Sequence, residues 1–405
     1  RVDGHQFIPD VFAKGAMAVI CEVLPKEDLG PCILVKDSFM ALKQAAAFYR
    51  QQLNIRVVGI TGSVGKTSTK EFVASVLSEK YKVHKTAGNY NNEVGLPLTI
   101  FGIQEDDQIA VLEMGINTFG EMHRLSEVAK PDICVMTNIG QCHLENLIDR
   151  DGILRAKSEI FDFMNPKGTV VVNGDDDKLA TIHEVYGKAP VTFGMNKQNA
   201  IWADHIENRG LLGSCADIHM GDDVVHAIIP LPGEHMIYNA MAAVAVALQF
   251  GMSKEEIAAG ISHVEAVAGR SHLVEAGDKV IIDDCYNANP VSMKAAIDLL
   301  ATAPGRKVAI LGDMFELGEN EKAMHGEVGE YAAEKGIDLI LCVGELSEAM
   351  YQEAVGSGGN AKYYETREAL EAVLNEILQQ GDTVLVKASH SMAFENLVKC
   401  IQVNH

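Results

Sequence analysis

A glycine-rich turn between a strand and a helix constrains the fold of this chain more than any other feature. Residues 55–77 read IRVVGITGSVGKTSTKEFVASVL. The β-branched apolar run at the start is typical of a buried parallel strand. After the glycines, apolar residues recur at helical spacing, namely Phe72, Val73, Val76 and Leu77. The stretch therefore predicts a strand, a tight turn and a helix, which is the arrangement around a phosphate-binding loop.

The turn itself has the residue types that bind a nucleotide. Glycines let backbone N–H groups turn inward around an anion, and the helix N-terminus adds the positive end of its dipole. A lysine reaches the outer phosphates, and a threonine hydroxyl can hold Mg²⁺. The loop is shortened, and a glycine-rich turn with an incidental lysine is the alternative reading. The expected nucleotide-binding residues are Gly62, Ser63, Val64, Gly65, Lys66, Thr67 and Ser68.

Composition limits the partners of such a site. The chain has 405 residues, a formal net charge of −22 at pH 7 and 47% hydrophobic residues. Because this charge disfavours a broad basic face, we expect no nucleic-acid partner and no stable membrane association. Its eight cysteines form no CxxC pair, which favours a reduced, cytoplasmic protein. The chain opens abruptly at Arg1, so we expect an N-terminal truncation.

The order of the predicted elements indicates an α/β protein of three domains. Residues 1–52 form a partial N-terminal α/β domain that is too small for a secure core. Residues 53–268 predict a central, mostly parallel sheet flanked by helices, with an antiparallel flap near 200–229. Residues 269–405 predict a Rossmann-like domain without a GxGxxG. Strands are expected near 55–60, 81–86, 108–113, 133–137, 169–173, 279–284, 307–311, 338–343 and 383–387.

Several polar residues of the central domain follow predicted strands, where open α/β folds bind ligands. Glu113 ends an apolar strand, and its carboxylate can coordinate Mg²⁺. The alternative is a solvated glutamate at the end of the strand without a ligand. His143 closes TNIGQCH, but a lone histidine is more often structural. Lys157 in RAKSEIF would by itself be a surface lysine. Asn91 and Asn92 in GNYNNEVGLP indicate either a polar turn or a loop that faces a ligand.

The second half of the chain adds candidate ligands from the domain junction onward. Asn239 shares a helical face with His235, where an amide can read an adenine edge or simply belong to a core helix. Arg270 follows a glycine at the junction, from which a guanidinium can reach a nucleotide phosphate. Two further clusters follow strands: Asp283, Tyr286, Asn287 and Asn289 in DDCYNANPVSM, and Lys387, Ser389 and His390 in LVKASHSMAFENL. The last cluster suits a carboxylate-bearing substrate or, equally, a capped helix.

Together these motifs resemble those of the Mur ligases, the ATP-dependent amide ligases that build the peptide of bacterial cell-wall precursors. TGSVGKTS, GNYNNEVGLP, LEMG, TNIGQCHLE, AKSEIF, DDCYNANPVSM and GDMFELG occur in the family's order. The resemblance covers nearly the whole chain and is strongest to the branch that adds D-alanyl-D-alanine. It implies ATP and Mg²⁺ as cofactors, and UDP-N-acetylmuramoyl-tripeptide and D-alanyl-D-alanine as substrates. We expect a monomer.

The resemblance also implies roles for the matched residues. As catalytic residues it implies Lys66, His143 and Lys157; as metal ligands Thr67, Glu113, His143 and Lys157; as nucleotide contacts Asn239, Arg270, Tyr286 and Asn287; and as substrate contacts Asn91, Asn92, Asp283, Asn289, Lys387, Ser389 and His390. Lys157 matches a lysine that several relatives carbamylate, which turns a cation into an anionic oxygen ligand for Mg²⁺.

The chain also departs from the family's pattern. Met236 stands where many relatives have asparagine, and Ala388 and His390 replace the usual glycine and arginine of the last motif. A histidine is a cation only when it is protonated. The N-terminal piece matches only the later part of the family's UDP-binding domain. A nucleotide-dependent switch or transport ATPase is the alternative from another class.

Overall fold

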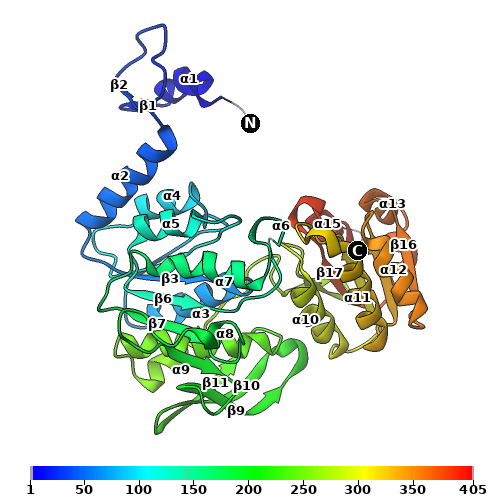
Figure 1. Ribbon diagram of the computed structural model, residues 1–405. Coiled ribbons are helices and arrows are strands. Elements are labelled where there is room, and N and C mark those ends of the chain that lie inside the picture. The colour runs from blue at the N-terminus through cyan, green and yellow to red at the C-terminus, as the bar shows by residue number, and fades with distance from the viewer. Residues whose placement is uncertain (1–2, 143, 404–405) are drawn as a thin grey trace.

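The computed structural model describes residues 3–142 and 144–403. These residues form three sheets, of two, nine and six strands. Each sheet marks one α/β unit, and in Figure 1 the N-terminal unit stands at the far end of a long helix, α2. The central unit lies below it, and the C-terminal unit lies beside the central one. The predicted α/β class with three units is confirmed.

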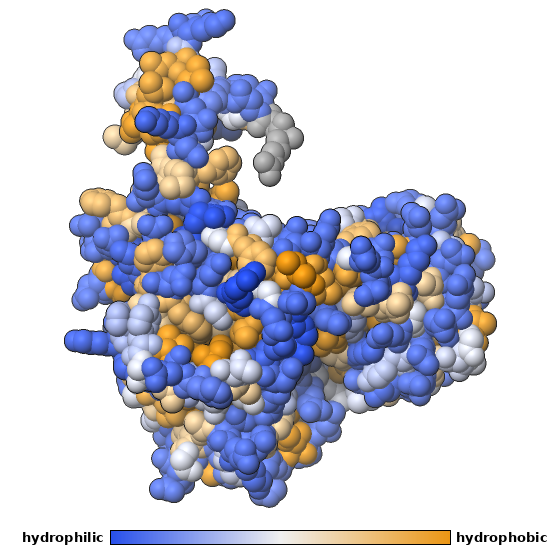
Figure 2. Space-filling view, in the orientation of Figure 1, coloured by the Kyte–Doolittle hydropathy of each residue, from blue (hydrophilic) through white to orange (hydrophobic). Residues whose placement is uncertain are grey.

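The N-terminal unit has almost no core of its own. It comprises η1 (Gly4–Phe7), α1 (Ile8–Ala13) and the parallel pair β1 (Val19–Cys21) and β2 (Cys32–Leu34). Only Ile8 and Cys21 are buried between residues 3 and 37, and Figure 2 shows apolar residues on its surface. Helix α2 (Ser38–Gln52) joins it to the central unit, where the Tyr49 hydroxyl donates to the Ile103 carbonyl oxygen at 2.7 Å.

The central sheet has the strand order β11-β10-β9-β8-β7-β6-β3-β5-β4. It is parallel from β4 to β9, and the last two pairings are antiparallel. Because β3 lies between β5 and β6, the loop after β3 lies where the strand order reverses, which is where such sheets bind ligands. The strands are β3 (Arg56–Thr61), β4 (Val83–Lys85), β5 (Ile109–Glu113), β6 (Ile133–Met136), β7 (Thr169–Asn173), β8 (Val191–Gly194), β9 (Ile201–Asn208), β10 (Ser214–Met220) and β11 (Asp223–Ile229).

Helices cover both faces of this sheet, so its strands are apolar on both sides. Successive side chains of β3 alternate, with Val58 and Ile60 in one core and Val57 in the other. The first core includes α3 (Lys66–Ser78), α8 (His235–Gln249) and α9 (Lys254–Ser262). The second includes α4 (Gly95–Phe101), α5 (Glu121–Ala129) and α7 (Arg150–Ser158), and α6 (Leu144–Leu147) precedes α7.

The C-terminal sheet has the order β12-β13-β17-β14-β15-β16 and is parallel except for its edge strand β12. Helices α10, α11 and α12 contribute to the core on one face, and α13, α14 and α15 to the core on the other. The strands are β12 (His272–Ala276), β13 (Lys279–Asp283), β14 (Lys307–Gly312), β15 (Leu339–Val343), β16 (Ala361–Tyr364) and β17 (Thr383–Lys387). The helices are α10 (Pro290–Ala301), α11 (Glu321–Glu334), α12 (Ser347–Gly356), α13 (Arg367–Glu371), α14 (Leu374–Ile377) and α15 (Glu395–Val403).

Every strand that the sequence predicted in the two larger units is present, with its ends shifted by two residues at most. The antiparallel flap is also present, and it extends the central sheet through β8. Strands β8, β12 and β16 were not predicted, since they are short and mix polar with apolar residues. The domain boundaries at residues 52 and 268 stay a prediction. Among the described helices, none has the length and apolarity needed to cross a bilayer.

The contact between α11 and α12 gives a test of the C-terminal packing. A Cβ at Gly329 would lie 1.9 Å from the Met350 carbonyl oxygen, so Gly329→Ala must separate the two helices. We expect the free energy of unfolding to fall by about 1–3 kcal/mol, the usual cost of overpacking. Gly356→Ala on α12 has nothing within 4 Å and should cost nothing. Urea unfolding measures both, and equal losses in the two variants would contradict this packing.

Candidate active site

A cavity of about 620 Å³ lies between the central sheet and the C-terminal unit. Its volume falls in the range of roughly 300–1,000 Å³ that is usual for small-molecule sites. It brings together loops that are more than 300 residues apart in the sequence, because it extends from Ser63 to Lys387. The residues predicted from sequence that line it are Ser63, Val64, Gly65, Lys66, Thr67, Ser68, Asn91, Asn92, Glu113, Asn239, Arg270, Tyr286, Asn287, Asn289 and Lys387.

The loop between β3 and α3 has the shape that the glycines predicted. Gly62 has φ of +150°, and a Cβ there would lie 1.9 Å from the Thr137 hydroxyl oxygen. Gly65 has φ of +84° and is the residue before the first turn of α3. Both positions favour glycine, the first also because another loop lies against it. The N-terminus of α3 therefore faces the cavity with its backbone N–H groups and the positive end of its dipole.

Lys66 lies over this loop. Its ammonium donates to the carbonyl oxygens of Gly62 at 2.9 Å and Ser63 at 3.4 Å. Burial lowers the pKa of Lys66, and the nearby Glu113 carboxylate opposes that shift. The lysine is thus held in place before any phosphate arrives.

The loop after β6 holds the phosphate loop in shape, a role that the sequence reasoning missed. The Asn138 amide oxygen accepts from the Val64 N–H at 2.9 Å, and its amide nitrogen donates to the Val64 carbonyl oxygen at 3.0 Å. The Thr137 hydroxyl donates to the same carbonyl oxygen at 2.6 Å. The motif TNIGQCH drew attention only to its histidine, although its first two residues make these contacts.

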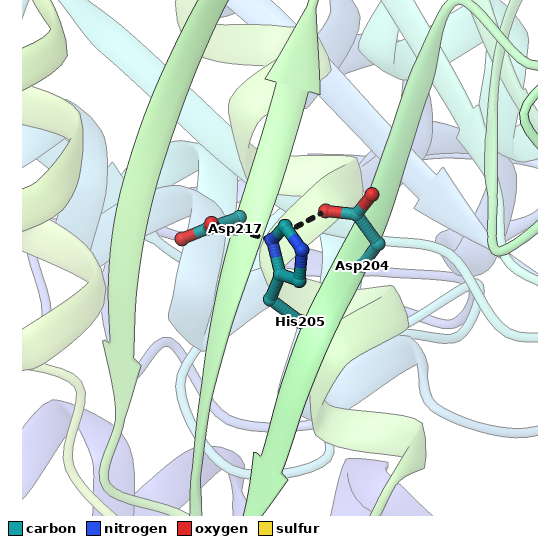
Figure 3. Close-up of side chains that lie close together, drawn as sticks. All are labelled: Asp204, His205 and Asp217. Carbon is teal, nitrogen blue, oxygen red and sulfur yellow. Dashed lines mark hydrogen bonds and ion pairs between the residues drawn. The ribbon is translucent and has the colours of Figure 1, made fainter.

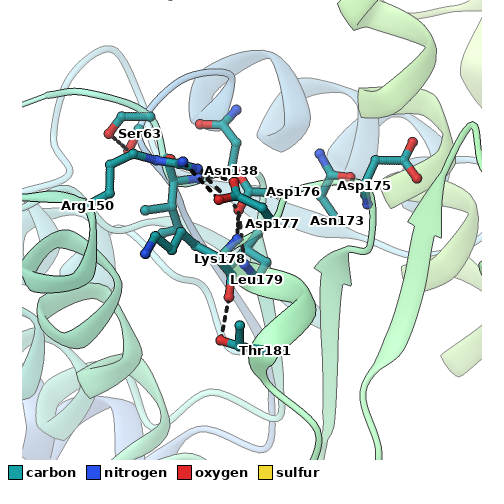
Figure 4. A network of polar contacts seen from close by, with 12 residues as sticks. Ser63, Asn138, Arg150, Asn173, Asp175, Asp176, Asp177, Lys178, Leu179 and Thr181 are labelled. Carbon is teal, nitrogen blue, oxygen red and sulfur yellow. Dashed lines mark hydrogen bonds and ion pairs between the residues drawn. The ribbon is translucent and has the colours of Figure 1, made fainter.

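Figure 4 shows the polar network that in turn supports this second loop. The Arg150 guanidinium donates to the Ile139 carbonyl oxygen at 2.8 Å, and the Asp176 carboxylate accepts from the Ile139 N–H at 2.8 Å. Arg150 also pairs with Asp177. Both the N–H and the carbonyl oxygen of Ile139 are thereby held by side chains from outside the loop. No spacing rule links these residues, because they come from three separate segments.

Glu113 has the features of a metal ligand. Its side chain is 1% exposed, and one carboxylate oxygen accepts from the Asn91 amide at 2.8 Å. The other oxygen is buried and has no hydrogen-bond partner among the described residues. A buried carboxylate oxygen without a partner is costly, so a missing cation is a natural explanation. Thr67 also lines the cavity, and its hydroxyl is a type of group that can coordinate Mg²⁺.

Lys157 and His143 complete the predicted metal set. Lys157 is 1% exposed on α7, so it is not the surface lysine that its sequence alone suggested. Burial, with a smaller contribution from the charge of Lys66, lowers its pKa to about 8. At this pKa an appreciable fraction of the amine is neutral near physiological pH. His143 lies outside the described residues, and its predicted role stays a prediction.

The hinge between the central and C-terminal units places Arg270 in the cavity. Its flanking residues are fixed, because the Gly269 N–H donates to Asp283 and the Ser271 N–H to Asp284, each at 2.9 Å. The Arg270 guanidinium lies 3.9 Å from the centre of the Tyr286 ring. It also approaches the Thr67 hydroxyl at 3.5 Å. The guanidinium therefore lies at the phosphate loop, and its contact with a nucleotide phosphate stays a prediction.

The candidate substrate residues are already engaged in several contacts. The buried Lys387 ammonium pairs with Asp284 at 2.5 Å and donates to the Asn287 carbonyl oxygen at 3.0 Å. Asn289 caps α10 through the Ser292 N–H. Asn92 likewise accepts from backbone N–H groups at the start of α4. These side chains shape the C-terminal wall and the neighbouring loop of the cavity.

Several other predicted residues do not simply line the cavity, and Gly62 and Lys157 are outside its lining as well. Asp283 and Ser389 do not line the cavity; the first accepts from the hinge and the second from the Phe315 N–H at 3.0 Å. His390 also lies outside the lining, with its ring 5.2 Å from that of Tyr286. The Asn239 amide accepts from the Thr69 hydroxyl at 2.9 Å, although it does line the cavity. Their ligand roles stay predictions.

Comparison with known families explains why a phosphate loop and a second α/β unit share one cavity. Residues 60–247 match the Mur ligase middle domain, and residues 269–390 match the family described as Mur ligase, glutamate ligase domain. A Bacillus subtilis UDP-N-acetylmuramoyl-tripeptide–D-alanyl-D-alanine ligase is 37% identical over 98% of this chain and 88% of its own length. The chain belongs to the Mur ligase family. The Escherichia coli ligase of the same name is 36% identical over 100% of this chain and 89% of its own length.

Solved Mur ligases share the whole fold. MurF from Acinetobacter baumannii has a TM-score of 0.91 at 33% identity, covering 100% of this chain and 89% of that one. MurF from Thermotoga maritima in complex with ADP has a TM-score of 0.86 at 29% identity, covering 100% and 92%. The resemblance inferred from the motifs is confirmed. This Mur ligase uses ATP, as the resemblance implied.

The contacts of Asn138 allow a test of nucleotide binding in this Mur ligase. Asn138→Ala removes both amide hydrogen bonds to Val64, and at about 1 kcal/mol each we expect ADP to bind roughly 10- to 30-fold more weakly. Asn165→Ala is the matched control, since its amide likewise donates one hydrogen bond, to the Asp132 carboxylate, but lies outside the cavity lining. Calorimetric titration with ADP measures both. Unchanged affinity in Asn138→Ala would contradict the role of this loop.

Proposed function

We propose that this Mur ligase adds D-alanyl-D-alanine to UDP-N-acetylmuramoyl-tripeptide and releases ADP and phosphate, in the synthesis of peptidoglycan precursors. The observation that carries the proposal is the shared cavity, in which a complete phosphate loop faces polar side chains of the C-terminal unit. The two relatives named above have this activity in their names, and this chain matches them over 88% and 89% of their length. We propose further that it acts in the cytoplasm as a monomer.

The chemistry requires activation, because a carboxylate is a poor acyl donor. The terminal carboxylate oxygen of the tripeptide attacks the γ-phosphorus of ATP, the bond to the β–γ bridging oxygen breaks, and ADP leaves. The dipeptide amine then attacks the carbonyl carbon of the acyl phosphate, loses a proton and expels inorganic phosphate. Lys66 and Arg270, both beside the phosphate loop, stabilise the charge that spreads over the transferring phosphoryl oxygens.

Mg²⁺ fits the residues around this loop. The buried Glu113 oxygen that has no partner within residues 3–142 and 144–403 supports one ligand, and Thr67 supplies a hydroxyl in the same cavity. We assign His143 and a carbamylated Lys157 to a second ion. When bound, the ions neutralise phosphate charge during transfer.

The C-terminal wall is the proposed site of the incoming dipeptide. The Lys387 ammonium is paired with Asp284, so this pair offers the dipeptide a nearly neutral, hydrogen-bonding surface. Asp283, Asn289, Ser389 and His390 are the remaining candidates on that side, and Asn91 and Asn92 are the candidates for the acyl substrate from the central unit. Closure of the two units around the hinge would keep water from the acyl phosphate.

The proposal predicts that ADP release requires both substrates. With ATP, Mg²⁺ and either substrate alone, we expect only background hydrolysis, and with both we expect one amide bond for each ADP. A coupled assay for ADP, together with mass spectrometry of the product, measures the ratio. Running the assay with lysine-containing and diaminopimelate-containing tripeptides identifies the accepted third residue.

A variant pair tests whether the phosphate loop drives this turnover. Lys66→Ala should lower kcat by about 100- to 1,000-fold, the usual loss when one donor to a developing charge is removed. Lys167→Ala, an exposed lysine outside the cavity lining, should not change it. Rapid ADP release without either peptide substrate would instead indicate a switch or transport ATPase.

The lowered pKa of Lys157 leads to a separate, spectroscopic prediction. Only the neutral amine reacts with CO₂, and its pKa is about 8, so the neutral fraction grows as the pH rises through that value. At constant dissolved ¹³CO₂, we expect a carbamate resonance that grows in the same range. Lys157→Arg should lack it. A resonance that persists in this variant, or its absence from the unmodified protein, would rule out the carbamate.

A further inference from the structure

Two carboxylates oppose each other on the antiparallel part of the central sheet, away from the nucleotide cavity. Asp204 on β9 and Asp217 on β10 are direct cross-strand partners. Like charges in such positions destabilise a strand pair, and a cation between them would remove that cost. Lys197 reaches one oxygen of Asp204 at 3.4 Å but is itself mostly exposed. The other carboxylate oxygens face imidazoles.

His205 lies between the two carboxylates, as Figure 3 shows. Its Nδ1 is 3.0 Å from an Asp217 oxygen and 3.3 Å from an Asp204 oxygen. The backbone is irregular at this point. His205 has φ of +47°, in the left-handed region, and the pairing register shifts between Cys215 and Asp217. One ring N–H can reach both oxygens only through a divided, weaker hydrogen bond, whereas a metal ion can be bound by all three atoms.

The spacing of these atoms suits a small transition-metal ion. The ligand atoms of Asp204, His205 and Asp217 all lie within 4.8 Å of one another. A tetrahedral zinc site with bonds of about 2.0–2.1 Å separates its ligand atoms by roughly 3.3–3.4 Å. The nitrogen-to-oxygen distances of 3.0 and 3.3 Å are close to that value before any ion is bound. Two of the three separations between ligand atoms are therefore already close to those of a zinc site.

Two further imidazoles orient the carboxylates. His219 Nε2 lies 2.7 Å from the Asp204 oxygen, and His226 Nδ1 lies 2.5 Å from the other Asp217 oxygen. His219 is itself held in place by stacking on Trp202, with ring centres 3.7 Å apart. Such outer partners fix the direction of the ligand oxygens and raise metal affinity.

We propose that Asp204, His205 and Asp217 bind one divalent transition-metal ion of the zinc type, which joins β9 to β10. The donor set of imidazole and carboxylate favours zinc over magnesium, which prefers oxygen alone. None of the three residues lines the nucleotide cavity, so the site is separate from the proposed ligase chemistry. Its expected effect is to stabilise this part of the sheet.

The single tryptophan of the chain provides a local probe, because Trp202 stacks on one of the orienting imidazoles. We expect Zn²⁺ titration of the full chain, in excess Mg²⁺, to change Trp202 fluorescence with a stoichiometry of one. His205→Ala and Asp217→Asn should each weaken binding by about 100-fold or more. His263→Ala is the control, an exposed histidine paired with a single carboxylate, Glu79, and should bind as the unmodified chain does.

Two further measurements decide between this site and adventitious binding. Co²⁺ should give a tetrahedral visible spectrum without a sulfur-to-cobalt charge-transfer band, and Zn²⁺ should raise Tm in the unmodified chain but not in His205→Ala. A sulfur band would place the ion on a cysteine such as Cys215. That result, unchanged affinity in His205→Ala, or displacement of Zn²⁺ by Mg²⁺ would each overturn the proposal.

Discussion

The close contact between Gly62 and Thr137 is the constraint on which the site depends. The loop after β3 lies against the loop after β6, and the space between them admits no Cβ at Gly62. Asn138 then fixes both backbone groups of Val64, and Arg150 with Asp176 fixes the loop that carries Asn138. The phosphate loop is therefore rigid before ATP binds, which lowers the entropic cost of binding it.

Positive charge gathers at the phosphate loop, although the chain as a whole is strongly negative. The protein carries a formal net charge of −22, and yet Lys66 and Arg270 meet at the phosphate loop. Glu113 and Lys157 are almost fully buried; one oxygen of Glu113 has no hydrogen-bond partner in the described part of the chain, and the pKa of Lys157 is lowered. Such arrangements cost stability, so they persist mainly where function requires them. Groups with perturbed protonation of this kind therefore gather at active sites.

The hinge connects the two halves of the site by short-range contacts. Asp283 and Asp284 accept from the backbone on either side of Arg270, so the guanidinium moves with the C-terminal unit. Its stacking on Tyr286 and its approach to Thr67 join that unit to the nucleotide loop. A small rotation at the hinge would therefore change the phosphate contacts and the C-terminal wall together.

The sequence by itself determined the local elements: the strand, turn and helix of residues 55–77, the strands with apolar runs, and the residues of the phosphate loop. These follow from periodicity and glycine geometry, which act over a few residues. Only the tertiary structure decided which side chains meet. It turned Asp283 and Ser389 toward backbone groups, buried Lys157, made Asn138 a support of the loop, and set Asp204 opposite Asp217. Partners across strands and loops depend on strand order and register, which no local pattern specifies.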